Sequence, residues 1–209
     1  MGLELIKQEK IIAVLRNIKV SDIDHVVKVL NNQDINLLEV TLNSPSALKV
    51  IEHIKERYDD VIVGAGTVLD SESARLAILS GAEFIFTPTV DRELIEMTKR
   101  YGVVCIPGAL TPTEILTAYA SGADAVKVFP INSMNKSYVK DLAGPLSHIP
   151  IVPTGGIDEE NIQYYLDQKN VIAVGVGSSL VNAANLSKED GISDLERRAR
   201  KLRSLANQT

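Results

Sequence analysis

Residues 125–129 read AVKVF, a short run of β-branched and aromatic residues with one lysine at its centre. A run this short that stops at a proline, here Pro130, predicts a buried strand rather than part of a helix. Side chains alternate between the two faces of a strand, so Val126 and Val128 share one face and Lys127 lies on the other. The stretch therefore predicts a buried strand that carries a single charged side chain.

Comparable apolar runs recur along the whole chain, at a spacing of roughly 20 to 25 residues. Their near-continuous hydrophobicity indicates strands that are covered on both faces, as in a parallel sheet. The predicted strands cover Ile11–Leu15, Leu37–Leu42, Val61–Val63, Phe84–Phe86, Val103–Ile106, Ala125–Phe129, Ile151–Val152 and Val171–Val176.

Amphipathic helical patterns separate these runs, and most of them follow a residue type that commonly caps a helix. Capping side chains accept hydrogen bonds from the first free N–H groups of a helix. The predicted caps are Ser21, Ser44 ahead of Pro45, Asp70, Asp91, Thr111 with Glu114 at capping-box spacing, and Asp158.

Eight strand–helix units in succession favour one α/β domain over residues 1–209, folded as a (β/α)8 TIM barrel with a short N-terminal helix. The alternative is a doubly wound open sheet, which usually has fewer units and a glycine-rich turn after its first strand. In this sequence Arg16 and Asn17 follow the first strand instead.

The composition is that of an ordinary globular chain of 209 residues with one cysteine and a net charge of −5. It excludes a disordered chain or a disulfide scaffold, and the charge disfavours binding to nucleic acid or to anionic membranes. No apolar stretch is long enough to span a membrane, so we expect a cytoplasmic protein. The basic run at residues 197–203 is interpreted as the solvated outer face of a helix.

Two charged residues are expected to project into the barrel. In the strand at 37–41, Leu38 and Val40 share one face and Glu39 lies on the other, as Lys127 does in its own strand. One interpretation is a buried ion pair, which contributes little net stability. The other is a desolvated lysine amine that serves as a nucleophile, with a carboxyl group nearby for proton transfer.

Glycines after the seventh and eighth strands predict a second part of the site. Gly155 and Gly156 follow Thr154, and Gly177 and Ser178 close the eighth strand. Loops at these two places commonly bind phosphate in such barrels, because glycine lets backbone N–H groups approach an anion. His25, His53, His148 and Cys105 are dispersed along the chain without metal-ligand spacing, so we expect no metal and no cofactor.

Seven segments resemble the 2-keto-3-deoxy-6-phosphogluconate (KDPG) and 4-hydroxy-2-oxoglutarate (KHG) aldolase family, which includes 2-keto-3-deoxy-6-phosphogalactonate aldolases. The segments are IIAVLR, LLEVTLNSP, VGAGTV, IPGALTPTE, AVKVFP, VPTGGI and AVGVGSSL, in family order between residue 11 and about residue 180.

The resemblance implies a homotrimer of barrels that carries out metal-independent class I aldolase chemistry, with a sugar acid and pyruvate as its small-molecule partners. Lys127 falls on the family's Schiff-base lysine and Glu39 on its general acid/base. The remaining matches are Thr67, Pro88 and Phe129 at the pyruvate end, and Thr154, Gly155, Gly156, Gly177 and Ser178 at the phosphate end.

Asn43 departs from the arginine that many gluconate-type members have at that position, where it helps hold the substrate carboxylate. Arg16 matches an arginine that other members use instead. The expected reaction is the reversible cleavage of KDPG to pyruvate and glyceraldehyde 3-phosphate, as in the Entner–Doudoroff pathway of carbohydrate metabolism. The phosphogalactonate epimer and 4-hydroxy-2-oxoglutarate stay open as substrates.

The sequence is also compatible with two further hypotheses. One is an isomerase or decarboxylase that uses Glu39 and Lys127 without a covalent intermediate. The other is a non-catalytic barrel that binds a phosphorylated sugar acid as a sensor and is stabilised by it without releasing pyruvate.

Overall fold

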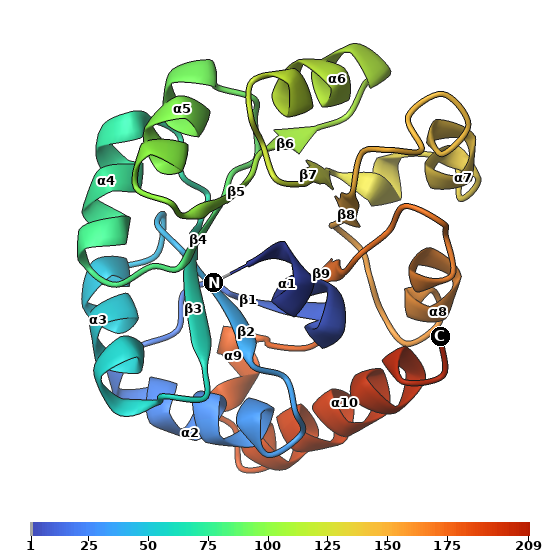
Figure 1. Ribbon diagram of the computed structural model, residues 1–209. Coiled ribbons are helices and arrows are strands. Elements are labelled where there is room, and N and C mark those ends of the chain that lie inside the picture. Colours follow the sequence, from blue (N-terminus) through green and yellow to red (C-terminus); the bar gives the residue numbers. More distant parts are fainter. Residues whose placement is uncertain (1) are drawn as a thin grey trace.

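Parallel strands lie at the centre of the computed structural model, which describes residues 2–209, and helices form a ring around them (Figure 1). The strands are β1 Ile11–Leu15, β2 Leu37–Thr41, β3 Ile62–Gly66, β4 Phe84–Phe86, β5 Val104–Ile106, β6 Gly108–Ala109, β7 Val126–Val128, β8 Ile151–Pro153 and β9 Val174–Val176. The helices are α1 Leu3–Glu9, α2 Val20–Asn31, α3 Ala47–Arg57, α4 Ser71–Leu79, α5 Arg92–Arg100, α6 Pro112–Ala120, the 3-10 turn η1 Ile131–Ser133, α7 Tyr138–Leu142, α8 Ile162–Leu166, α9 Ala183–Leu186 and α10 Gly191–Ala206.

The strands form two hydrogen-bonded parallel sheets. The larger sheet has the order β5-β4-β3-β2-β1-β9 and makes a six-stranded half-barrel, and the smaller has the order β6-β7-β8. In the larger sheet β1 and β2 pair with Val14 opposite Glu39, and in the smaller sheet Gly108 lies opposite Lys127. The α/β fold with a parallel sheet expected from the sequence is therefore confirmed.

The uninterrupted eight-stranded barrel is not seen in these ladders. β5 and β6 are separated by Pro107, which has no N–H to donate, although its carbonyl accepts from the Lys127 N–H at 2.9 Å. No ladder joins β8 to β9 within residues 2–209. Two isolated parallel bridges lie there instead, one between Ile151 of β8 and Val171 and one between Thr154, just after β8, and Gly175 of β9. The expected set of eight continuous strands is thus replaced by a six-stranded and a three-stranded sheet.

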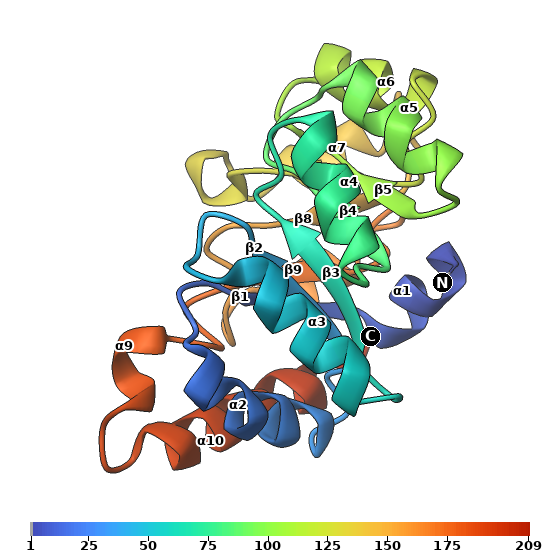
Figure 2. The same ribbon diagram turned by 90° about the vertical axis from the view of Figure 1, so that its left-hand side faces the viewer.

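Two apolar clusters hold the fold together. The larger lies between the strands and the surrounding helices and includes Val126 and Val128, on the face that the alternation predicts. The smaller lies inside the ring of strands, where Phe84 and Phe86 pack with Ile6 of the expected N-terminal helix, α1. In Figure 2, α1 and α9 lie at opposite ends of the ring of strands. The α1 end is thus filled by apolar side chains.

Three of the predicted helix caps are confirmed. Asp70 and Asp91 accept hydrogen bonds from the N–H groups of Ser73 and Leu94, and Thr111 and Glu114 form the reciprocal capping box. The other three are wrong. α2 begins before Ser21, α3 has Ser46 at its N-cap because the Ser44 hydroxyl is bonded elsewhere, and α8 begins after Asn161 rather than after Asp158.

The basic run on α10 is only partly the solvated face expected. The side chains of Arg197 and Arg200 are 64% and 67% exposed. Arg198 and Arg203 are 19% and 11% exposed and donate to backbone carbonyl groups of other segments. Within residues 2–209, no helix combines the length and the hydropathy needed to cross a membrane.

Candidate active site

A cavity of about 610 Å³ lies at the carboxyl ends of the strands. All twelve residues predicted for the site line it, from segments that are distant in sequence. They are Arg16, Glu39, Asn43, Thr67, Pro88, Lys127, Phe129, Thr154, Gly155, Gly156, Gly177 and Ser178. The fold brings these residues together because parallel strands that alternate with helices all end on the same side.

Lys127 extends from β7 into an aromatic environment and is only 5% exposed. Its Nζ lies 4.1 Å from the ring centroid of Phe86 and 4.8 Å from that of Phe129. Desolvation lowers the pKa of Lys127 below the ordinary value of 10.5; the Glu39 carboxyl opposes this shift and the Arg16 guanidinium adds to it. A lower pKa increases the fraction of free amine, the form that attacks a carbonyl carbon.

Glu39 projects from β2 into the same cavity and is 1% exposed. Its Oε2 is buried and has no hydrogen-bond partner within residues 2–209. Desolvation raises the pKa of this carboxyl group, against the opposing effects of Lys127 and Arg16. A buried carboxyl group whose pKa is raised holds its proton more readily than an exposed one, and it can act both as an acid and as a base.

The buried ion pair considered from the sequence is not formed. Among the ion pairs of residues 2–209, none joins Glu39 to Lys127 within 4.0 Å. The two groups share one cavity and still influence each other's pKa. They are therefore placed to interact through a molecule bound between them rather than with each other.

The loop that carries Arg16 is tied to the neighbouring loop. The N–H of Asn17, a residue in the left-handed region with φ of 57°, donates to the Ser44 hydroxyl at 2.8 Å. That hydroxyl also lies 2.8 Å from the hydroxyl of the buried Thr41. Thr67, after β3, also has a positive φ, of 56°, which is rare for a β-branched residue and concentrates at functional sites.

The two loops that carry Gly155, Gly156 and Gly177 form another part of the cavity wall. Gly155 and Gly156 have φ values of 101° and 70°, which favour glycine over other residues. A Cβ on Gly156 would lie 2.7 Å from the Cβ of Asn132, so this loop packs closely on the segment after β7. The hydroxyl of Thr154 lies against Gly175 of β9, where a Cβ would be only 2.4 Å away.

Sequence reasoning missed part of the cavity wall. Nine further residues line it: Val14, Asn17, Ile157, Asp158, Ser179, Val181, Asn182, Ala183 and Ala184. Val14, Asn17, Ile157, Asp158 and Ser179 each lie within two residues of a predicted site residue, so adjacency could have indicated them. The residues at 181–184 belong to α9 and the turn before it, and four helical residues are too few to show a periodic pattern.

The remaining polar candidates lie apart from this site. Cys105 is fully buried in β5, and desolvation raises the pKa of its thiol to about 12, so it is not a ready nucleophile. His53 bonds to Asp24 between α3 and α2. Across residues 2–209, no three His, Cys, Asp or Glu side chains gather as metal ligands do.

A parallel α/β fold with a buried lysine amine and a protonatable carboxyl group in one cavity is the arrangement of an enzyme that forms imines with carbonyl substrates. The family model described as KDPG and KHG aldolase matches residues 3–195. The chain belongs to this aldolase family and is therefore a lyase.

Named relatives agree with that placement. A 2-dehydro-3-deoxy-6-phosphogalactonate aldolase of Escherichia coli K12 is 35% identical over 176 residues, covering 83% of this chain and 85% of the relative. A 2-dehydro-3-deoxy-phosphogluconate aldolase of Haemophilus influenzae is 32% identical over 174 residues, covering 83% and 82%. A solved structure described as native KDPGal is 30% identical, with a TM-score of 0.88 over 95% of this chain and 94% of that one.

Proposed function

We propose that this protein is a class I aldolase that cleaves a 2-keto-3-deoxy-6-phospho sugar acid, KDPG foremost, into pyruvate and glyceraldehyde 3-phosphate. The observation that carries the proposal is the buried Lys127 amine, which shares its cavity with the Glu39 carboxyl group and Arg16. The family supports an aldolase, and a lysine of lowered pKa is the nucleophile that a metal-independent aldolase requires.

Imine formation comes first. The Lys127 amine attacks the C2 ketone, and the resulting carbinolamine loses water to give an iminium ion. Glu39 donates a proton to the departing hydroxyl, a role favoured by burial, which raises the pKa of this carboxyl group. The rings of Phe86 and Phe129, already close to Nζ, accommodate the positive charge of the iminium by cation–π attraction.

Carbon–carbon cleavage follows because the iminium is an electron sink. The C4 hydroxyl gives its proton to a base, the C3–C4 electron pair moves toward the iminium nitrogen, and the aldehyde leaves. The enamine is then protonated at C3, and hydrolysis of the iminium releases pyruvate and restores the Lys127 amine. We assign both proton transfers to the Glu39 carboxyl group, acting directly or through a water.

The two ends of the substrate are held by different parts of the cavity. Arg16 is the cation suited to bind the pyruvate carboxylate, with Thr67, Pro88 and Phe129 around it. We assign the phosphate to Thr154, Gly155, Gly156, Gly177 and Ser178, whose backbone N–H groups and hydroxyls suit an anion. Binding energy from this remote group helps align the bond that breaks.

Asn43 lies at the exposed rim of this cavity, and it bears on which sugar acid is accepted. The phosphogluconate and phosphogalactonate substrates differ in configuration at C4, and 4-hydroxy-2-oxoglutarate lacks the phosphate. A pyruvate-release assay with all three ranks them by kcat/KM. We expect KDPG to rank first; a higher kcat/KM for either of the others would reassign the substrate.

We further propose how the chain is organised. The short gap between β5 and β6, which only Pro107 separates, and the Thr154–Gly175 bridge support one closed eight-stranded barrel and one domain over residues 1–209. The exposed side chains of Leu69, Leu76 and Leu79 on and near α4 support association of the barrels, as a homotrimer. Cytoplasmic location is proposed with this metabolic role.

Borohydride trapping tests the mechanism. Incubation with pyruvate and borohydride should leave a stable pyruvate adduct on Lys127, as mass spectrometry of peptides can show. Lys127→Met should abolish the adduct and turnover, whereas Lys201→Met, a change of the same kind at an exposed position on α10, should leave both intact. Glu39→Gln should slow turnover and leave some imine detectable.

A metal chelator distinguishes this mechanism from a metal-dependent one, because the iminium supplies the electron sink. We expect turnover to be unchanged by the chelator. An unmodified Lys127 after borohydride treatment, or activity lost on chelation, would refute the proposed mechanism. Pyruvate adduct formation without cleavage of any of the three sugar acids would contradict the assigned substrate class.

A further inference from the structure

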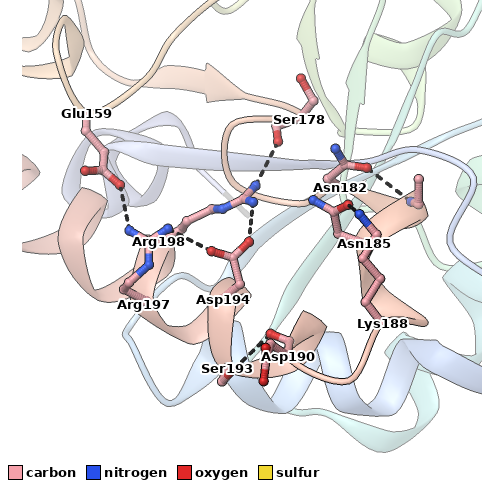
Figure 3. A network of polar contacts seen from close by, with 11 residues as sticks. Glu159, Ser178, Asn182, Asn185, Lys188, Asp190, Ser193, Asp194, Arg197 and Arg198 are labelled. Carbon is pink, nitrogen blue, oxygen red and sulfur yellow. Dashed lines mark hydrogen bonds and ion pairs between the residues drawn. The ribbon is translucent and has the colours of Figure 1, made fainter.

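The backbone carbonyl of Ser178, in the loop after β9, is held from behind by α10. Arg198 donates from Nη1 to the Ser178 carbonyl oxygen at 3.3 Å, and its Nη2 pairs with Asp194 one turn earlier on the helix (Figure 3). The Arg198 side chain is 19% exposed, in contrast to Arg197 beside it at 64%. Arg198 is therefore committed to the loop rather than to solvent.

This contact fixes the direction of one peptide group. In a trans peptide the C=O and the following N–H point in opposite directions. Since the Ser178 carbonyl faces α10, the N–H of Ser179 faces away from that helix, and both serines line the cavity. Within residues 2–209 the Ser179 N–H has no hydrogen-bond acceptor. A donor on the carbonyl oxygen also polarises the peptide and strengthens the N–H as a donor.

The facing loop is restrained in the same manner. The Asn161 amide donates to the Gly156 carbonyl oxygen at 2.8 Å, and the Ser179 hydroxyl donates to the carbonyl of Ile157. Carbonyl oxygens, which repel an anion, are thus engaged by side chains in both loops. The pattern leaves N–H groups of the two loops available at the distal end of the cavity.

We propose that Arg198 is a positioning residue for the distal anion: it orients and polarises the Ser178–Ser179 peptide so that the Ser179 N–H binds the terminal phosphate of the substrate. This role rests on the proposed function, which assigns a phosphorylated substrate to the cavity. Arg198 itself does not line the cavity, so its effect is transmitted through the peptide.

The test compares two arginines of the same helix. Arg198→Met removes the donor and keeps the aliphatic stem, and Arg198→Lys keeps one donor. Arg200→Met is the matched control, because Arg200 pairs with Glu196 as Arg198 pairs with Asp194 but is 67% exposed and bonds to no loop among residues 2–209. The measurements are KM and kcat for the phosphorylated sugar acid, inhibition by inorganic phosphate, and borohydride trapping of pyruvate.

For Arg198→Met we expect KM and the inhibition constant of inorganic phosphate to rise about tenfold, as for loss of one charge-assisted hydrogen bond. Pyruvate trapping should stay within about twofold, because pyruvate has no distal group. The kcat for the phosphorylated substrate should fall by a smaller factor than KM rises, because the remote group also helps align the bond that breaks. Arg198→Lys should lie between wild type and Arg198→Met, and Arg200→Met should match wild type.

Equal effects of Arg198→Met and Arg200→Met, or an equal loss of pyruvate trapping and phosphate inhibition, would overturn the positioning role. If Arg198→Met does not fold, Arg198→Lys decides: unchanged KM and phosphate inhibition in that variant would also overturn it. Failure of the wild-type protein to trap pyruvate would instead refute the proposed function, and phosphate binding would still report on Arg198.

Discussion

Gly66→Ala tests whether the position of the Glu39 carboxyl group limits catalysis. Gly66 ends β3 opposite Thr41 of β2, and the side chain of Glu39 lies against it; the backbone of Gly66 is not in the region that requires glycine. An alanine Cβ there would lie 1.6 Å from Glu39 Oε1 and 2.2 Å from the carboxyl carbon. The added methyl group must therefore displace the carboxyl group, while the strand itself can keep its conformation.

The size of the effect follows from the distance. An ordinary contact begins near 3.4 Å, so the oxygen has to move by about 1.8 Å. A misplacement of about 1 Å can cost roughly 100-fold in rate. We expect kcat to fall at least about 100-fold, which is about 2.7 kcal/mol in activation free energy.

The assay is steady-state pyruvate release, with thermal unfolding and borohydride trapping on the same samples to show that the variant is folded and that Lys127 still reacts. Gly144→Ala is the control, because its Cβ would meet its nearest atom at 3.5 Å. In a Glu39→Gln background, adding Gly66→Ala should lower kcat by less than about threefold, because the acid/base group is already lost. Wild-type kcat in Gly66→Ala, or an equal loss in both backgrounds, would refute the reasoning.

Three more predictions follow from pKa shifts and capping. Because the pKa of Lys127 is lowered by desolvation, the rate of pyruvate trapping with cyanoborohydride should rise with pH and level off before pH 10.5; a rate still rising there would contradict it. Because the pKa of Glu39 is raised, the folded chain keeps a proton above pH 4.5 that the unfolded chain loses, so this group's contribution to stability falls as pH rises. Above pH 4.5, the free energy of unfolding of Glu39→Gln, measured by urea titration, should thus increase with pH relative to that of the wild-type protein. A difference between the two proteins that does not grow with pH would contradict a raised pKa of Glu39. Thr111→Ala removes the capping box of α6 and should lower the free energy of unfolding by about 0.5–2 kcal/mol, with no change expected in pyruvate trapping.

The strands were predictable because each is short, apolar and bounded by turn residues. β1 and β4 have the predicted bounds, and β7 lies inside the run at 125–129. The face on which Lys127 lies was predictable as well, since alternation along a strand is a local property. The meeting of Lys127 with Glu39, which are distant in the chain, followed only from the fold class inferred.

Features that depend on contacts between distant segments were not predictable. Ser44 is a residue type that commonly caps helices, but its hydroxyl accepts from the Asn17 N–H, and α3 begins only at Ala47. Arg198 belongs to a basic run that resembles a solvated surface, yet it bonds to a carbonyl of a loop 20 residues away. In each case the local sequence is compatible with two roles of the side chain, and contacts with a distant segment decide between them.

The apolar cluster that joins α1 to Phe84 and Phe86 fills one end of the protein, so the two ends of the protein have different roles. Side chains of the β4 and β5 strands in this cluster contribute packing, and Phe86 among them also contacts the Lys127 amine, whereas the loops after β8 and β9 lie on the far side and contact the cavity. Exchanging those loops should alter which distal group is accepted without disturbing the interior. Directed evolution toward aldehydes without a phosphate therefore has a confined target, namely the two loops and the α10 face that supports one of them.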